Sequence, residues 1–284
     1  MIKLIVSDMD GTLLAHDSSI SKGNIEAIRY AQSKGVQFAI ATGRDYSSLK
    51  GILEAHDLKC FSILGNGAQF CNENGEILSS AYFPKKCFKQ VLQIFDELKI
   101  HYMIFTANGF YSTAEPNVVR DAFIDRCVVQ FKRKREDYLD DDCNQDMACM
   151  KLKKIGDLDD FINSSIDIIK VEAFNNDVSL IEKAKEKLQE IDGIAYLSSF
   201  DDNIEVTDKA AQKGLILENV IEELGYSKDE VMVLGDGLND ITLFERFKYS
   251  FAPGNANETI KAMAYQVVGA CEEDGVSQAI YMML

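Results

Sequence analysis

The chain has 284 residues, of which 46% are hydrophobic. This length and composition indicate about two domains with sizeable cores. The formal net charge is −16 and the sequence pI is about 4.6. Such a charge opposes binding to nucleic acid and to anionic membranes, because both are bound by clustered Lys and Arg side chains. We therefore expect neither of these partners, and an anionic ligand must be captured by local groups.

The cysteines and the apolar runs indicate the compartment. The seven cysteines are odd in number and form no C-x-x-C pair. The first apolar run, Ile2–Val6, is too short for a secretory signal, and no apolar stretch approaches the roughly 20 residues of a membrane span. We predict a cytoplasmic protein with reduced thiols, and no feature of the sequence indicates an obligate protein partner. The cysteines are Cys60, Cys71, Cys87, Cys127, Cys143, Cys149 and Cys271.

The first part of the chain alternates strand and helix patterns. Short apolar runs predict buried strands at Lys3–Ser7, Val36–Ala41 and Phe61–Leu64. Apolar residues at helical spacing predict helices over Asn24–Ser33 and around Leu49–Leu53. This alternation is typical of a parallel sheet.

The C-terminal part resumes the same alternation. A helix is predicted over Leu215–Leu224, followed by an apolar strand over Glu230–Leu234. Shorter strands are predicted at Tyr249–Ala252 and Gln266–Gly269. Together with the first part, these elements predict an α/β core of Rossmann-like type with a parallel sheet.

The middle of the chain has a different pattern, in which strands and helices do not alternate regularly. It contains predicted strands at His101–Thr106 and Asp167–Phe174, and predicted helices at Cys87–Leu98 and Ser179–Ile191. We therefore expect a core formed by residues 1–82 and 198–284. We expect residues 83–197 to form a second, α+β domain inserted after the third strand.

Polar clusters follow four of the predicted core strands. Asp8 and Asp10 follow the first strand, Thr42-Gly43-Arg44 the second, Asn66-Gly67 the third, and Asp236–Asp240 a later one. Ligands of open parallel sheets bind at the carboxyl ends of the strands. We therefore expect these clusters to converge on one edge of the sheet.

The aspartate pair predicts metal-assisted phosphoryl transfer. Two aspartates this close need help to stay ionised together, and a divalent cation of the Mg²⁺ type would hold both, with Asp236 as a third carboxylate. Asp8 can then attack phosphorus, while Asp10 protonates the leaving oxygen and later activates water. Gly11 permits a tight turn, and we expect Thr12 to orient Asp10 through a hydrogen bond.

Two other readings of these motifs fail. A calcium loop beginning at Asp8 requires Gly at its sixth position and Glu at its twelfth, where this chain has Leu13 and Ser19. A dinucleotide loop beginning at Gly235 requires a third glycine, where this chain has Asp240.

Taken in order, the motifs resemble those of the haloacid dehalogenase superfamily. They are DMDGTLL from Asp8, TGR from Thr42, KG from Lys213 and GDGLND from Gly235. The insertion after the NGA sequence at Asn66 resembles the Cof-type branch, which carries a large α/β cap. The resemblance covers nearly the whole chain. It implies a Mg²⁺-dependent phosphatase of small phosphorylated metabolites whose cap governs substrate choice.

The resemblance also implies roles for the matching residues. Asp8 matches the nucleophile and a metal ligand, and Asp10 matches the acid/base, with its backbone carbonyl on the metal. Lys213 matches the lysine that neutralises the nucleophile and the phosphate. Asp236 matches the third metal ligand, and Asp240 belongs to the polar support around it.

Further residues match positions that bind substrate or phosphate. The hydroxyl of Thr42 is expected to bind the transferring phosphoryl group, with Gly43 and Asn66 close by. Asn239 supports the metal site and is a candidate for contact with substrate. Arg44 either contacts substrate or pairs with a nearby carboxylate, and the sequence leaves both roles open.

Three functions are compatible with these motifs. The first is a phosphatase acting through an aspartyl phosphate on sugar phosphates, pyridoxal phosphate or FMN. The second is a phosphosugar mutase of the same superfamily, which must keep the phosphoryl group from water. The third is a catalytically silent binding protein with the same fold, which the presence of every charged motif residue disfavours. One departure from the family pattern is Pro253, before Gly254-Asn255.

Overall fold

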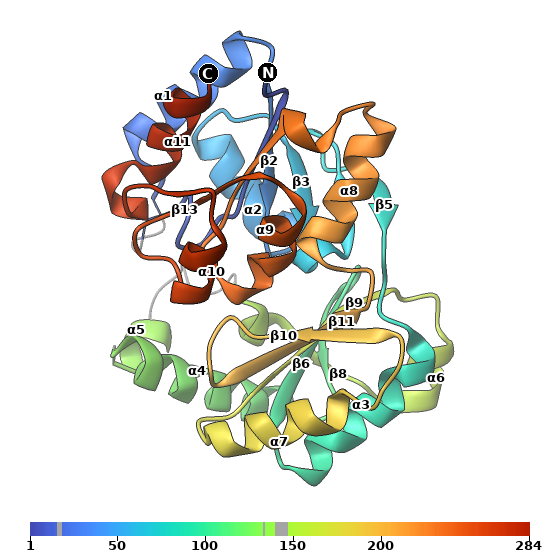
Figure 1. The fold of residues 1–284 in the computed structure, drawn as a ribbon. Helices are drawn as coiled ribbons and strands as arrows, with labels where there is room; N and C mark the ends of the chain where they lie inside the picture. Colours follow the sequence, from blue (N-terminus) through green and yellow to red (C-terminus); the bar gives the residue numbers. More distant parts are fainter. Residues whose placement is uncertain (16–18, 133, 140–146) are drawn as a thin grey trace. The chain divides into compact units, whose positions relative to one another are not determined.

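The computed structural model describes residues 1–15, 19–132, 134–139 and 147–284, which divide into two compact units (Figure 1). Unit 1 consists of Met1–Ala81 and Ala210–Leu284, and unit 2 is the contiguous segment Tyr82–Lys209. Residues 198–209, which we expected in the core, belong to unit 2. The reason is that β11 (Asn203–Asp208) pairs with β9 (Ile168–Phe174) in the sheet of that unit.

Unit 1 is built on an eight-stranded sheet with the order β14-β13-β12-β1-β2-β3-β4-β5. The strands from β14 to β3 run parallel, and β1 lies between β12 and β2 with Leu4 beside Val231 and Gln37. The Rossmann-like α/β core with a parallel sheet is therefore confirmed. The bounds are β1 (Leu4–Ser7), β2 (Gln37–Ala41), β3 (Phe61–Leu64), β4 (Gln69–Cys71), β5 (Ile77–Ser80), β12 (Val231–Leu234), β13 (Tyr249–Ala252) and β14 (Gln266–Val267).

The insertion begins after β5 and not after the third strand. The chain turns back from β3 through the antiparallel strands β4 and β5 before it enters unit 2. Neither strand was predicted from the sequence. Strand β4 has only three residues, and β5 is an edge strand whose Ile77 and Leu78 are exposed, so neither shows the apolar pattern of a buried strand.

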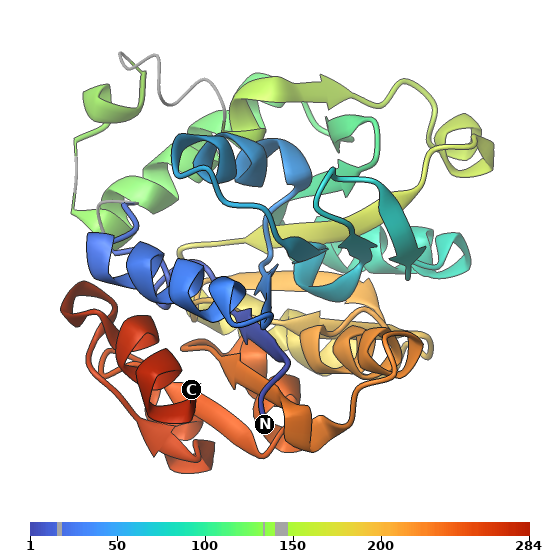
Figure 2. The same ribbon diagram turned by 90° about the horizontal axis from the view of Figure 1, so that it is seen from above.

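Helices cover both faces of the unit 1 sheet. Side chains alternate along β1, so that Ile5 packs with α1, α2 and α11, whereas Leu4 and Val6 pack with α8, α9 and α10. Figure 2 shows α1, in blue, beside α11, in dark red. There the backbone N–H of Ser277 donates to Asn24 Oδ1 over 2.9 Å. The bounds are α1 (Lys22–Ser33), α2 (Tyr46–Ala55), α8 (Lys213–Glu223), α9 (Ile241–Arg246), α10 (Glu258–Met263) and α11 (Gly275–Met283).

Unit 2 is an α+β domain on a six-stranded sheet with the order β10-β11-β9-β6-β7-β8. All neighbouring pairs are antiparallel except β7 and β8. Helices α3, α6 and α7 pack on one face, and α4 packs on the other. The remaining bounds are β6 (His101–Thr106), β7 (Gly109–Ser112), β8 (Leu152–Lys154), β10 (Ile194–Leu197), α3 (Lys85–Glu97), α4 (Pro116–Phe131), α5 (Glu136–Leu139), α6 (Leu158–Asn163) and α7 (Val178–Leu188).

Six of the seven cysteines lie in the described part of the chain, where they are buried free thiols. The seventh, Cys143, lies outside the described residues. Among the described helices, none is long and apolar enough to cross a membrane.

Candidate active site

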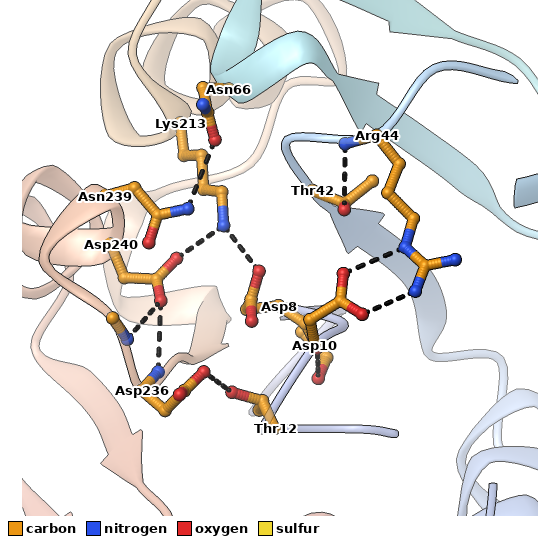
Figure 3. A network of polar contacts seen from close by, with 12 residues as sticks. Asp8, Asp10, Thr12, Thr42, Arg44, Asn66, Lys213, Asp236, Asn239 and Asp240 are labelled. Carbon is orange, nitrogen blue, oxygen red and sulfur yellow. Dashed lines mark hydrogen bonds and ion pairs between the residues drawn. The ribbon is translucent and has the colours of Figure 1, made fainter. Parts of the chain in front are cut away.

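The four predicted clusters converge at the carboxyl edge of the unit 1 sheet (Figure 3). Asp8 directly follows β1, and Thr42 directly follows β2. Asn66 lies in a 3₁₀ turn after β3, and Asp236 follows β12. Lys213, the first residue of α8, reaches the same place from the start of that helix. The parallel strands and the short turns after them therefore bring together residues that lie far apart in the sequence.

The centre of the site is a fully buried ammonium group. Lys213 Nζ lies 2.5 Å from Asp8 Oδ1 and 2.7 Å from Asp240 Oδ1, and the Lys213 side chain is 0% exposed. Asp240 Oδ2 also accepts from the backbone N–H groups of Asp236 and Gly237, both over 3.0 Å. Asp240 thus holds Lys213 and the turn after β12 in one arrangement.

Two glycines allow Lys213 to reach this position. A Cβ on Gly214 would lie 2.1 Å from the backbone oxygen of Thr242 in α9, so only glycine lets α8 begin this close to the helix that follows Asp240. A Cβ on Gly67 would lie 2.7 Å from backbone atoms of Gln212. The KG and NGA motifs thus contain the glycines that position the lysine.

The cluster carries an excess of negative charge. Carboxylate oxygens of Asp8, Asp236 and Asp240 lie within 4.8 Å of one another, and Lys213 neutralises only one of the three charges. Burial and repulsion from its neighbours raise the pKa of Asp8 well above its ordinary value in spite of Lys213. Burial, followed by repulsion from Asp240, raises the pKa of Asp236 to about 6. This cluster of three carboxylates therefore favours the binding of a proton or of a cation.

Asp10 is separated from this cluster. Its carboxylate accepts from Arg44 Nε over 2.9 Å and from Arg44 Nη2 over 2.6 Å, in a two-point ion pair. The Asp10 side chain is 55% exposed, whereas that of Asp8 is 7% exposed. We expected one cation to hold both carboxylates, but in this structure each has its own basic partner. Of the two roles left open for Arg44, the structure shows the pairing with a carboxylate.

Thr12 also differs from the expectation. Its hydroxyl donates to Asp236 Oδ1 over 2.8 Å and does not contact Asp10. The turn at Gly11, with φ +81°, swings Thr12 toward β12, and a Cβ on Gly11 would lie 2.5 Å from Asp236 Oδ2. The glycine is therefore required both by the backbone and by the nearby carboxylate.

The side chain of Asn255 is a supporting group that the sequence analysis did not identify. Its amide donates to the backbone oxygen of Gly11 over 2.7 Å, and its oxygen accepts from Cys271 N over 2.8 Å. Only the resemblance of Gly254-Asn255-Ala256 to the family could have indicated it. Pro253 accepts a backbone hydrogen bond from Ala256 within the same loop.

The residues expected to bind phosphate, Thr42, Gly43 and Asn66, complete the candidate site. Thr42 is buried, and its oxygen accepts from the backbone N–H of Arg44 over 3.2 Å, which leaves its hydroxyl proton for another acceptor. Asn66 has a left-handed backbone with φ 60°, and its Oδ1 accepts from Asn239 over 3.2 Å. A Cβ on Gly43 would lie 3.1 Å from Asn66 Oδ1, so a larger residue at position 43 would crowd the Asn66 side chain.

The donor set fits a hard divalent cation. Both oxygens of Asp240 already have donors, so Asp8 and Asp236 are the carboxylates with coordination capacity left. Oxygen-only ligands, partial burial and two uncompensated negative charges suit Mg²⁺ better than a softer metal.

Comparison with known proteins identifies the family. Residues 5–280 match the family described as haloacid dehalogenase-like hydrolase. The chain belongs to this family. Its curated relatives include phosphatase YwpJ of Bacillus subtilis, which is 26% identical over the whole of both chains. The 5-amino-6-(5-phospho-D-ribitylamino)uracil phosphatase YcsE of the same species is 28% identical, over 98% of this chain and 94% of that protein.

The solved structures agree with this family. A haloacid dehalogenase-like hydrolase from B. subtilis superposes with a TM-score of 0.85 at 25% identity, and the match covers 100% of both chains. The family and the fold class predicted from the motifs are therefore confirmed. The prediction of a phosphoric monoester hydrolase agrees with the two curated relatives, because both are phosphatases.

Proposed function

We propose that this member of the family is a Mg²⁺-dependent phosphatase that hydrolyses small phosphorylated metabolites through an aspartyl phosphate on Asp8. The observation that carries the proposal is the buried Lys213 between Asp8 and Asp240, with Asp236 in the same cluster of carboxylates. A fully buried ammonium beside a carboxylate at the end of β1 suits a nucleophile that must approach an anionic group.

The residues of the site divide the reaction among them. Asp8 Oδ attacks phosphorus, and the bond from phosphorus to the leaving oxygen breaks while that oxygen takes a proton from Asp10. Asp10 then takes a proton from water, whose oxygen displaces the Asp8 carboxylate from phosphorus. Lys213 offsets the charge of Asp8, and the Thr42 hydroxyl donates to a phosphoryl oxygen.

Asp8 and Asp236 would hold the Mg²⁺ ion, with the backbone carbonyl of Asp10 as a further ligand. When bound, the ion supplies charge neutralisation that lets an anionic nucleophile approach an anionic phosphate. Thr12 fixes the carboxylate of Asp236 for this purpose.

We place the substrate among primary alkyl phosphates, such as sugar phosphates esterified at a primary hydroxyl, pyridoxal phosphate and FMN. YcsE is named for a phosphate on a ribityl chain, and FMN carries the same group. Unit 2, Tyr82–Lys209, is proposed as the cap that selects among these compounds.

Phosphate release from a panel of such compounds tests the proposal, with the wild type and Asp8→Asn measured in EDTA and in Mg²⁺. We expect Mg²⁺-dependent release by the wild type only. Equal release by Asp8→Asn, or full activity in EDTA, would overturn the mechanism. Transfer of the phosphoryl group to a second phosphosugar without release of phosphate would instead identify a mutase.

A further inference from the structure

The pairing of Asp10 with Arg44 is not explained by metal binding or by the fold. Asp8 and Asp10 lie one residue apart, yet the structure gives them separate cations, Lys213 for the first and Arg44 for the second. The guanidinium contacts both oxygens of Asp10 through two different nitrogens. A two-point contact of this kind fixes the plane of the carboxylate as well as its position.

The backbone around Arg44 is itself held in place. Its N–H donates to the Thr42 hydroxyl over 3.2 Å, and its carbonyl accepts from Gly65 N over 3.0 Å. The next residue, Asp45, caps α2 by accepting from the N–H of Ser48 over 2.9 Å. The backbone of Arg44 is therefore bonded to the residues that follow β2 and β3 and directly precedes the N-cap of α2, so it is a fixed support for a group on the loop after β1.

Exposure to solvent limits what the pair contributes to folding. The side chains of Asp10 and Arg44 are 55% and 31% exposed, and ion pairs this exposed stabilise proteins only weakly. The ionised carboxylate that Arg44 binds is also the form that Asp10 has after it has given its proton to the leaving oxygen. The contact is thus suited to the chemistry of Asp10 more than to stability.

We propose that Arg44 is a positioning residue that acts through Asp10. It holds the acid/base carboxylate apart from the Asp8, Asp236 and Asp240 cluster and orients it toward the leaving oxygen. This inference rests on the proposed function, because it assigns to Asp10 the transfer of a proton to that oxygen. A residue that bound the phosphoryl group directly would affect the hydrolysis of all phosphate esters equally. Arg44 instead affects the hydrolysis of those esters whose leaving oxygen needs a proton from Asp10.

Leaving groups of different basicity separate these roles. The leaving oxygen of an alkyl phosphate must take up a proton so that it departs as the neutral alcohol. p-Nitrophenolate is stable as an anion and departs without a proton. The value of kcat/KM reports the steps up to release of the alcohol or phenol, so it excludes the common hydrolysis of the aspartyl phosphate. We would measure kcat/KM for p-nitrophenyl phosphate and for whichever of glucose 6-phosphate, pyridoxal 5′-phosphate and FMN is hydrolysed fastest.

Arg44→Ala should lower kcat/KM for the alkyl phosphate by about tenfold or more relative to p-nitrophenyl phosphate, as part of the 10²–10⁴-fold that general acids supply. Arg44→Lys should recover part of this selective loss. In an Asp10→Asn background, Arg44→Ala should change the ratio no further. Arg29→Ala, which removes an exposed arginine on α1, is the matched control and should leave the ratio unchanged.

Equal losses on the two substrates, no loss on either, or an undiminished Arg44 effect without Asp10 would each overturn the inference. If the wild type hydrolyses none of the three alkyl phosphates, the proposed function fails instead, and the inference fails with it. Thermal unfolding of each variant separates a defect in folding from a defect in positioning, and Arg44→Lys provides the same comparison if Arg44→Ala does not fold.

Discussion

Replacing Asp236 by Asn should stabilise the metal-free chain while it removes activity. The carboxyl group of Asp236 has a pKa raised from 3.8 to about 6, chiefly by burial and by Asp240. The difference corresponds to about 3 kcal/mol, an upper value for the cost of keeping this charge in the folded state. The Asn side chain removes the charge and keeps an oxygen that accepts from the Thr12 hydroxyl.

The sign of the effect depends on pH. A carboxyl group with a raised pKa holds its proton to a higher pH in the folded chain than in the unfolded chain. Its contribution therefore lowers stability as the pH rises from about 4 to about 6, and the full penalty remains at higher pH. The advantage of Asp236→Asn should be about a third of its full size near pH 4.5 and complete at pH 8. One kcal/mol corresponds to about 2–4 °C in Tm for a domain of this size, so a gain of several degrees is expected.

The assay is thermal unfolding at pH 4.5 and pH 8, in EDTA and in Mg²⁺. Mg²⁺ should raise the Tm of the wild type far more than that of Asp236→Asn, because an ion that binds only the folded site stabilises it. Asp229→Asn is the matched control, since it makes the same change of charge at an exposed position. No gain in EDTA at pH 8, or the same gain at both pH values, would refute the reasoning.

Four further changes test the site and its support. Asp8→Asn should abolish turnover with little change in the far-UV circular dichroism spectrum, and turnover near the wild-type rate would exclude Asp8 as the nucleophile. Lys213→Met should lower the free energy of unfolding by about 3–5 kcal/mol in EDTA, because it leaves buried carboxylates without their cation; urea titration measures this, and an unchanged midpoint would contradict it. Gly214→Ala should cost about 1–3 kcal/mol, because its Cβ would meet the Thr242 oxygen at 2.1 Å. Gly51→Ala, with open space around its Cβ, should raise the Tm.

The sheet and its polar edge could be predicted from the sequence because both follow from local patterns. Apolar runs such as Phe61–Leu64 and Tyr249–Ala252 have the predicted bounds, since buried parallel strands consist of little else. The residues after them then had to lie at one edge. The three-residue β4 and the exposed β5 carry no such pattern, and only pairing with their neighbours makes them strands.

The partners of individual side chains could not be predicted in the same way. The basic partners of Asp8 and Asp10 could not be told apart from the sequence. Only the path of the loop places Asp8 beside Lys213 and Asp10 beside Arg44. From the sequence, the hydroxyl of Thr12 could be expected to bond Asp10 as well as Asp236. The positive φ of Gly11 places it beside Asp236. The roles of these residues in catalysis stay predictions for the experiments above.

The order of the strands also determines when the site can form as the chain is synthesised. Strand β1, which directly precedes Asp8, emerges from the ribosome first, but its neighbour β12 does not begin until Val231. Unit 2 is contiguous, so its whole sheet has been translated while unit 1 still lacks three of its eight strands, β12, β13 and β14. Lys213 and Asp236 follow only near the end. A chain released early therefore carries all of unit 2 but lacks Lys213 and Asp236, so the active site that we propose cannot form in it.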